Sequence, residues 1–335
     1  MRKINYKFIG KKAVGFTIIL FIALLLNFII PRLIPGGPAA EVKAFLEEQG
    51  IPPTTKLLHA VEVEMGISTA PEYIQFYQYL VDVAHGNLGV SILYYPEAVS
   101  KIVAQALPWT LLIVISATVI SFFIGNKLGR YAALKRNSWK DKLIVLTTMF
   151  AGGIPAFSAG IILLYVFSFD LHILPPFHPY SLSTTTPGFN LPFVISVIDH
   201  AILPVATLTV ISLATWMLHM RNNMIPTITD DYINFARMLG VSNAEITKIA
   251  YRNALLPNLT GFAMALAYSV SGALLIEEIF SYPGIGYYMF TAIQGQDYPL
   301  MQGLFLILVV AVLVANLIVD LIYGLFDPRV TAEAG

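Results

Sequence analysis

The sequence has no cysteine and little charge. Without cysteine, the 335-residue chain can form no disulfide, no thiolate metal site and no cysteine nucleophile. Charged residues make up 12% of the chain, whereas a soluble domain carries roughly 25%, and 57% of the residues are hydrophobic. The formal net charge is zero, so nothing indicates a nucleic-acid partner. These deficits predict a protein that is solvated largely by lipid.

Common catalytic motifs are also missing. A P-loop requires G-x-x-x-x-G-K-[ST], and the single Gly-Lys pair, Gly10–Lys11, is followed by Lys12 in a basic tail. Neither G-x-S-x-G nor H-E-x-x-H occurs in the sequence. We therefore expect this chain not to be an enzyme, and to have no cofactor-binding or metal-binding residues.

Long uncharged runs are what the chain does contain. Six stretches without Asp, Glu, Lys or Arg are long enough to cross a bilayer, which takes about 20 residues. They are Ala13–Pro31, Ile102–Asn126, Leu143–Phe169, His200–Met220, Asn253–Ile276 and Tyr298–Val319. The first is interpreted as a signal anchor, because no small-x-small cleavage site precedes Pro31. The sequence predicts an all-α, polytopic membrane protein with six transmembrane helices.

The distribution of basic residues predicts the orientation. Of the 20 Lys and Arg, 16 lie in the two chain tails and in the loops that follow the second and fourth spans. The loops 170–199 and 277–297 have none. Because basic residues favour the cytoplasmic side, both termini are predicted to be cytoplasmic, in a multi-pass protein of the cell (inner) membrane.

The same pattern predicts the domain boundaries. They are a cytoplasmic tail 1–12, a first transmembrane helix 13–34, a small extracytoplasmic domain 35–100, and a five-helix core 101–335 that includes cytoplasmic helices 230–256. In the extracytoplasmic segment, four aromatic residues are expected to cover one helix face, although a poorly ordered loop is the alternative. These residues are Tyr73, Phe76, Tyr77 and Tyr79. The proline-rich loop 171–193 is interpreted either as an external lid or as a plain connector.

A polar stretch at 230–258 lies between two long apolar runs of the chain. Asp230 or Asp231 is placed to cap a helix that starts near Tyr232 and ends at Gly240. Ser242–Glu245 has the capping-box pattern for a second helix. The first helix has about two turns, too few to be stable alone in water, so we expect it to pack on a partner protein. The alternative, a helix lying on lipid, would favour more Lys and Arg than the one Arg present.

This stretch, "NFARMLGVSNAEITKIAYRNALLPNL", resembles the cytoplasmic coupling motif of ABC-importer permeases. Ala236, Gly240 and the pair Leu256–Pro257 fit the motif, whereas Asn234 and Phe235 stand where the family usually has Glu and Ala. "PRLIPGGPA", "HGNLGVSILYYPEAV", "EEIFSYPGIGYYMFTAIQGQDYPLMQG" and "NLIVDLIYGLFDPRV" are similar, in order, to elements of the oligopeptide/dipeptide branch. The resemblance covers nearly the whole chain.

The resemblance implies a subunit that does not work alone. Its protein partners would be a second homologous permease, two cytoplasmic ATPase subunits and an extracytoplasmic solute-binding protein. The chain would also contact the lipid bilayer, and no nucleic acid would bind. The residues expected to couple to the ATPase are Tyr232, Asn234, Phe235, Ala236, Arg237, Leu239, Gly240, Glu245 and Pro257. The substrate implied is an oligopeptide or dipeptide, with oligosaccharides and nickel carried by related systems.

A few polar residues near the spans allow two interpretations. Asn316 and Asp320 share one face of the sixth span, and Glu277 and Glu278 follow the fifth. Each pair could serve the transport pathway or only the structure. An ion-coupled secondary transporter or channel is the alternative function, but it would usually bury charged residues near the middle of the membrane, which these spans lack. A membrane scaffold without transport is a third class.

The orientation is directly testable. Because the segment Pro35–Ser100 is predicted to lie outside, a single cysteine introduced as Glu64→Cys should react with a membrane-impermeant thiol label on intact cells. Reaction only after the membrane has been opened would overturn the predicted topology. The cytoplasmic assignment of 230–258 would fall with it.

Overall fold

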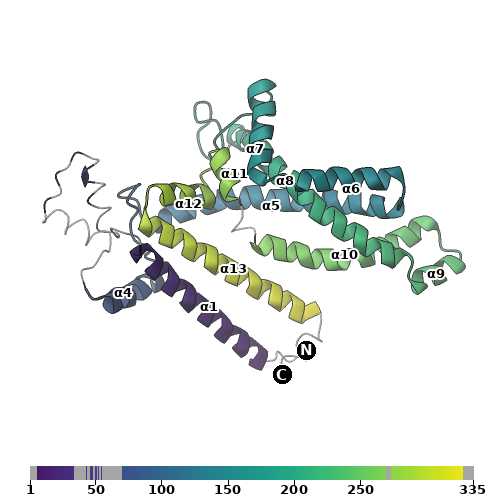
Figure 1. The fold of residues 1–335 in the computed structure, drawn as a ribbon, viewed down its shortest axis with the longest axis horizontal. Coiled ribbons are helices and arrows are strands. Elements are labelled where there is room, and N and C mark those ends of the chain that lie inside the picture. The colour runs from purple at the N-terminus through teal and green to yellow at the C-terminus, as the bar shows by residue number, and fades with distance from the viewer. Residues whose placement is uncertain are drawn as a thin grey trace. The chain divides into compact units, whose positions relative to one another are not determined.

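The structure is a computed structural model that describes residues 6–33, 70–268 and 273–326, together with isolated positions between 43 and 54. Most of positions 35–69 in the predicted extracytoplasmic domain therefore lie outside the described residues. The chain divides into two compact units, which are described separately. The terminal unit is Met1–Trp109 with Pro283–Gly335, and the central unit is Thr110–Tyr282. Apart from an isolated β-bridge between Val90 and Ala98, the regular structure of the described residues is helical, which confirms the all-α prediction (Figure 1).

The terminal unit is built around two long helices. Helices α1 (Tyr6–Arg32) and α13 (Tyr298–Phe326) lie side by side, and the short helix α4 (Glu72–Ala84) packs on α1 (Figure 1). The unit also contains the start of α5 (Val99–Leu134) and helix α12 (Ile285–Gln294), which contacts α13.

Two amides join α1 to α13 reciprocally. The side chain of Asn27 donates to the backbone carbonyl of Gln302 at 2.7 Å, and the side chain of Gln302 donates to the carbonyl of Asn27 at 3.0 Å. Buried polar groups are costly without partners, so this pairing fixes which faces of the two helices meet.

Asp297 holds the loop that precedes α5. Its buried carboxylate accepts from the Ser91 hydroxyl, from the backbone N–H of Leu93 at 3.0 Å and from that of Leu300 at 3.1 Å. The last bond satisfies a free N–H in the first turn of α13. One carboxylate thus caps a helix and fixes a loop about 200 residues away in the sequence.

Among the described residues, the central unit continues α5 and adds seven helical elements. These are α6 (Trp139–Gly152), α7 (Ala156–Leu164), the π-helical turn η1 (Tyr165–Asp170), α8 (Leu191–Ile228), α9 (Asp231–Met238), α10 (Asn243–Tyr268) and α11 (Leu274–Ile279). Helix α8 is the centre of the unit, because α6, α7 and α10 all pack on it.

Glycines let α5 approach α8 closely. Gly125 and Gly129 form a G-x-x-x-G pair on α5, a pattern that allows membrane helices to pack backbone to backbone. A Cβ at Gly129 would lie 2.3 Å from the Met217 carbonyl oxygen, and one at Gly125 would lie 2.5 Å from the Trp216 Cβ. No side chain fits at either position, so the contact depends on the absence of a Cβ.

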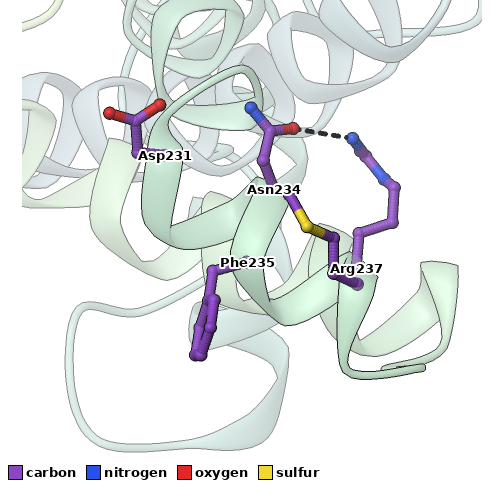
Figure 2. Close-up of a pocket in the computed structure, with 5 residues that line it drawn as sticks. Asp231, Asn234, Phe235 and Arg237 are labelled. Carbon is purple, nitrogen blue, oxygen red and sulfur yellow. Dashed lines mark hydrogen bonds between the residues drawn. The ribbon is translucent and has the colours of Figure 1, made fainter.

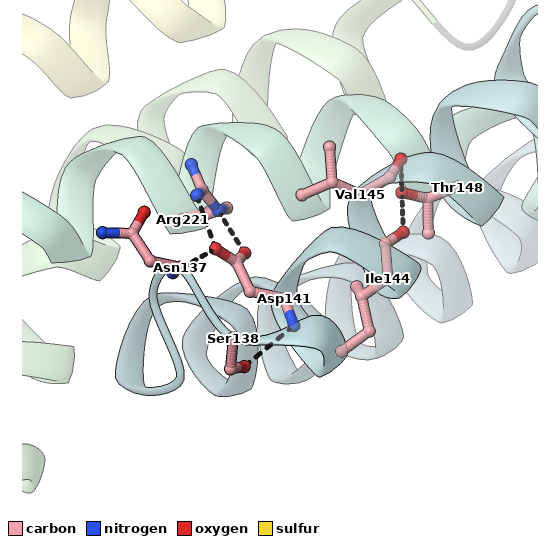
Figure 3. Close-up of polar contacts among 7 residues, drawn as sticks. All are labelled: Asn137, Ser138, Asp141, Ile144, Val145, Thr148 and Arg221. Atoms are coloured by element: carbon pink, nitrogen blue, oxygen red, sulfur yellow. Dashed lines mark hydrogen bonds and ion pairs between the residues drawn. The ribbon is translucent and has the colours of Figure 1, made fainter.

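An ion pair fastens α6 to α8 (Figure 3). Arg221 donates to both carboxylate oxygens of the buried Asp141, at 2.7 Å and 2.8 Å. The backbone N–H of Asn137 donates to the same carboxylate at 3.0 Å. The guanidinium of Arg221 holds the pKa of Asp141 below its usual range, because it stabilises the ionised form. Both residues lie outside the predicted spans, Asp141 in the first turn of α6 and Arg221 seven residues before the end of α8.

The membrane-crossing helices differ in one respect from the prediction. Among the described residues, α5 and α8 are long and apolar enough to cross a bilayer, and the described apolar stretches of α1 and α13 are shorter. The predicted third span, Leu143–Phe169, is not one helix. It is a pair, α6 and α7–η1, bent by 95°. The break falls at Gly153–Pro155, where proline has no N–H to continue the helical bonding. The count of six spans stays a prediction.

The glycine contact predicts opposite effects for two similar substitutions. Gly129→Ala should lower the stability of the central unit by about 1–3 kcal/mol, because the new methyl group meets backbone. Gly261→Ala on α10 is the matched control, since its Cβ would meet only the Trp216 ring at 3.7 Å. It should be neutral or gain up to about 1 kcal/mol from helix propensity. Thermal unfolding of the purified proteins in detergent measures both, and equal midpoints would contradict the packing argument.

Candidate functional site

The predicted helix, glycine turn and second helix are present at 230–258. Helix α9 is capped by Asp230, whose carboxylate accepts from the N–H of Asp231 at 2.9 Å, and ends at Met238. Gly240 has φ +80°, a conformation that glycine adopts without strain. The hydroxyl of Ser242 then accepts from the N–H of Glu245 at 3.3 Å, in the first turn of α10. Local caps therefore fix both ends of the turn.

One face of α9 is attached to the membrane helices. Ile233 is fully buried in an apolar cluster with residues from α5, α8 and α10. Its members are Ala133, Met220, Met224, Ile233, Ile246, Ala250 and Ala254. Beside this cluster, the side chain of Asn253 donates to the Tyr232 hydroxyl at 2.8 Å. Helix α9 is thus held by packing and by a hydrogen bond to α10.

The opposite face of α9 is open and apolar. Phe235, Met238 and Leu239 are 62%, 81% and 67% exposed. A shallow pocket lies on this face, lined by Asp231, Asn234, Phe235, Arg237 and Met238. In Figure 2 the Arg237 side chain reaches back to Asn234, to whose side-chain oxygen it donates at 3.0 Å. The ring of Phe235 projects away from that polar pair. Large exposed apolar side chains grouped on one face indicate a surface that another molecule covers.

A chain of three asparagines continues from α10 into the membrane helices. The side chain of Asn223 on α8 donates to that of Asn258 on α10 at 2.9 Å. Asn258 donates in turn to Asn126 on α5 at 2.7 Å. Asn126 and Asn258 are both buried, so breaking either bond would leave a polar group without a partner in an apolar setting. Three helices are therefore locked together one residue beyond Pro257.

The structure groups most, but not all, of the residues expected to couple to a partner. Asn234, Phe235 and Arg237 line the pocket, and Leu239 and Gly240 directly follow α9. Pro257 lies well inside α10, about 20 Å along the helix from its start at Asn243. It therefore belongs to the connection with the membrane helices and not to the exposed face.

The same expectation placed Tyr232, Ala236 and Glu245 at the coupling site. Tyr232 is partly exposed and faces Asn253, and Ala236 is half-buried. Glu245 is exposed in the first turn of α10. None of these three lines the pocket, so the structure assigns them to the base of the helical pair.

The four remaining polar candidates belong to different units. Glu277 is fully buried in α11. Glu278 beside it is half-buried, with one carboxylate oxygen that accepts no hydrogen bond among the described residues. Asn316 and Asp320 both lie on α13, and the side chain of Asp320 is outside the described residues. Their role in a pathway stays a prediction.

Sequence reasoning missed the residues that anchor the helical pair. Ile233 was not singled out, although Ile233 and Ala236 lie three apart, on the side of α9 away from Phe235 and Leu239. Met238 was also missed, although it follows Phe235 by three and enlarges the same exposed face. No sequence signal brings Asn126, Asn223 and Asn258 together, since they come from three helices.

These features are those of a polytopic helical membrane protein in which α9 and the start of α10 form a helical pair. Residues 125–332 match the family described as the binding-protein-dependent transport system inner membrane component. The chain belongs to this family, and it is a permease subunit of an ABC importer. This sets aside the alternative of an ion-coupled secondary transporter or channel.

Several curated relatives align over nearly their whole length. The di/tripeptide transport system permease DppB of Pseudomonas aeruginosa is 33% identical, covering 91% of this chain and 93% of the relative. The oligopeptide transport system permease AppB of Bacillus subtilis is 30% identical over the same shares. The glutathione transport system permease GsiC of Escherichia coli K12 is 27% identical, covering 98% and 99%.

The positive φ of Gly240 predicts a strict requirement for glycine. Gly240→Val should strain the turn by roughly 1–3 kcal/mol, although a Cβ there would meet no atom within 4 Å. We expect normal membrane insertion with loss of complex assembly or transport. Gly86→Val is the matched control, because Gly86 has φ +77° and equally open surroundings outside the site. Wild-type transport by Gly240→Val, or equal loss in both variants, would argue against a specific role for this turn.

Proposed function

We propose that α9 of this permease subunit docks into a cleft of a cytoplasmic ATPase and transmits its motion to the membrane helices. The observation that supports this is the division of α9 into two faces. Ile233 fastens one face to α8 and α10, while Phe235, Met238 and Leu239 leave the other face uncovered. A helix built this way is fixed to the membrane part and free to bind a second protein.

The charges around α9 favour a protein over a lipid surface. A surface-lying helix would place Lys and Arg beside its apolar face. The pocket instead has one basic residue, Arg237, which is engaged by Asn234, and one acidic residue, Asp231. An apolar patch with one charge of each sign at its border is typical of a protein interface with an apolar centre and a polar rim.

Motion of the ATPases would reach the membrane along a short path. Because Ile233 is buried against α8 and α10, displacement of α9 moves those helices with it. The chain Asn223–Asn258–Asn126 then ties α8 and α10 to α5. For this to drive transport, the ATPase contacts on α9 must differ between the two states of the transporter, since binding shifts an equilibrium only through differential affinity.

The complete transporter would contain five protein subunits, because permeases of this family work with ATPase and solute-binding partners. This chain would pair with a second homologous permease, with two ATPases on the cytoplasmic side and a solute-binding protein on the other. ATP hydrolysis would take place on the partners, so this chain would be a non-catalytic subunit. Both termini would be cytoplasmic, and the segment 35–100 would lie outside.

The substrate proposed is a short peptide. The relatives are named for di/tripeptide, oligopeptide and glutathione transport, and all three substrates contain peptide bonds. The exposed side chains of the permease do not identify the peptide. Titration of short peptides against the cognate solute-binding protein tests the class, and selective binding of an oligosaccharide or nickel would replace it.

The docking of α9 is tested by Phe235→Asp. The wild-type ring would bury its apolar surface on the ATPase, a contact worth roughly 1.5–3 kcal/mol. The variant loses that contact and places an unpaired charge in the interface. We expect ATPase affinity for the purified permease pair to fall at least tenfold, with membrane insertion unchanged, in a pull-down of ATPase on permease.

Ile249→Asp is the matched control for this experiment. Ile249 is a partly exposed apolar residue on α10 that does not line the pocket, and the substitution adds the same charge one helix away. It should leave ATPase recovery close to wild type. Equal recovery with Phe235→Asp and Ile249→Asp would show that this face of α9 is not the docking surface.

A further inference from the structure

Helix α4 has two apolar sectors, which adjoin at Leu80, and one polar sector. With about 100° between successive residues, Phe76 and Tyr79 fall on one side of the helix. Tyr73, Tyr77 and three neighbours fall within about 100° of arc on a second side. These neighbours are Ile74, Val81 and Ala84. Gln75, Gln78 and Asp82 occupy the remaining arc, about 60° wide. The four aromatic residues therefore do not share one face, contrary to the expectation from sequence.

The first apolar sector packs on α1. The Phe76 ring lies 5.1 Å from that of Phe28 and 6.1 Å from that of Phe21, and the Tyr79 ring lies 5.8 Å from that of Phe28. The side chain of Asn27 also donates to the Tyr79 hydroxyl at 3.2 Å. These contacts attach α4 to the flank of α1 and fix its rotation about its own axis.

The second apolar sector is left open. Tyr73 is 75% exposed and Tyr77 is 68% exposed, and Val81 on the next turn is also exposed. Neither acidic residue of the helix, Glu72 or Asp82, falls within this sector. An isolated exposed tyrosine needs no explanation, but two at i, i+4 spacing beside a valine form a continuous strip.

We propose that this strip lies in the lipid headgroup layer, so that α4 is an interfacial helix with its polar arc toward water. The surface beside it is already lipid-facing. On α1, Phe21, Ile22 and Leu26 are exposed next to the point where α4 packs, and α1 belongs to a multi-pass membrane protein. The strip formed by Tyr73, Tyr77 and Val81 continues that apolar surface around the side of α4.

The depth and the residue type both suit this position. The partners of α4 on α1 extend from Asn27, about 7.5 Å before α1 ends at Arg32, to Phe21, about 16 Å before that end. Tyr79 bonds the shallower of the two. Interfacial helices bury their apolar face about 5–10 Å into the headgroup boundary. Tyrosine is enriched at this level because its ring is apolar and its hydroxyl remains hydrated. On the predicted topology, the leaflet is the extracytoplasmic one.

Lipid and protein would cover this strip in ways that can be told apart by which molecules still reach it. A solute-binding protein or the second permease would exclude both water and lipid from Tyr77, whereas a bilayer excludes water alone. The proposal goes beyond the proposed function and does not depend on ATPase docking at α9. Its test therefore gives an answer whether or not that docking is correct.

The chain has no cysteine, so single labels can be placed without altering other positions. Tyr77→Cys and Gln78→Cys are one residue apart but fall in different sectors. Each would carry a nitroxide on the assembled transporter in phosphatidylcholine–phosphatidylglycerol nanodiscs. We expect the label at 77 to collide more with oxygen, which concentrates in lipid, than with a water-soluble nickel chelate. The label at 78 should show the reverse order.

Three outcomes decide the matter. Oxygen preference at 77 with nickel preference at 78 supports the lipid position. Equal nickel access at both positions would show a solvated helix, and exclusion of both reagents at 77 would show that protein covers the strip. Either result overturns the proposal. Val81→Cys, in the same sector as Tyr77, replaces Tyr77→Cys if that variant does not assemble, and it should give the same oxygen preference.

Discussion

The burial of Ile233 is the interaction on which the position of α9 depends. A helix of eight residues does not persist alone in water, and α9 has few internal hydrogen bonds to hold it. Packing Ile233 among side chains from α5, α8 and α10 supplies what the helix lacks and also fixes which face it turns outward. The exposed strip of Phe235, Met238 and Leu239 is a consequence of that orientation. The same side chain therefore sets both the attachment of α9 and the face that it exposes.

The membrane helices solve a different packing problem from α9. In lipid there is little hydrophobic gain from bringing two apolar helices together, so close backbone contact and polar pairing must hold them. Gly125 and Gly129 allow close backbone contact between α5 and α8. Asn126 and Asn258 form a polar pair between α5 and α10. These contacts make the central unit stiff where α9 joins it. In the proposed coupling, this stiffness would let a displacement of α9 move the long helices with it.

Sequence reasoning succeeded where short-range chemistry decides structure. The ends of α9 and α10 depend on Asp230, Gly240 and Ser242, each acting within four residues of its own position, so their roles could be predicted. It failed where the deciding partner is distant in the chain. The bend near Pro155 was hidden inside a run of apolar residues whose composition satisfied a straight span. Phe76 and Tyr77 are neighbours in sequence, yet only contact with α1 separates the packed aromatic side of α4 from the open one.

Two kinds of polar contact hold the long helices together. One is a neutral amide pair, as in Asn27 with Gln302 and Asn126 with Asn258, in which each group needs only one or two partners. The buried ion pair Asp141–Arg221 lies instead where α6 begins and α8 approaches its end, near water. Burying charge is costly in lipid, whereas an amide pair satisfies itself at a lower desolvation penalty. Where α5, α8 and α10 meet, the described polar contacts are amide pairs, which join the helices without the cost of burying a charge.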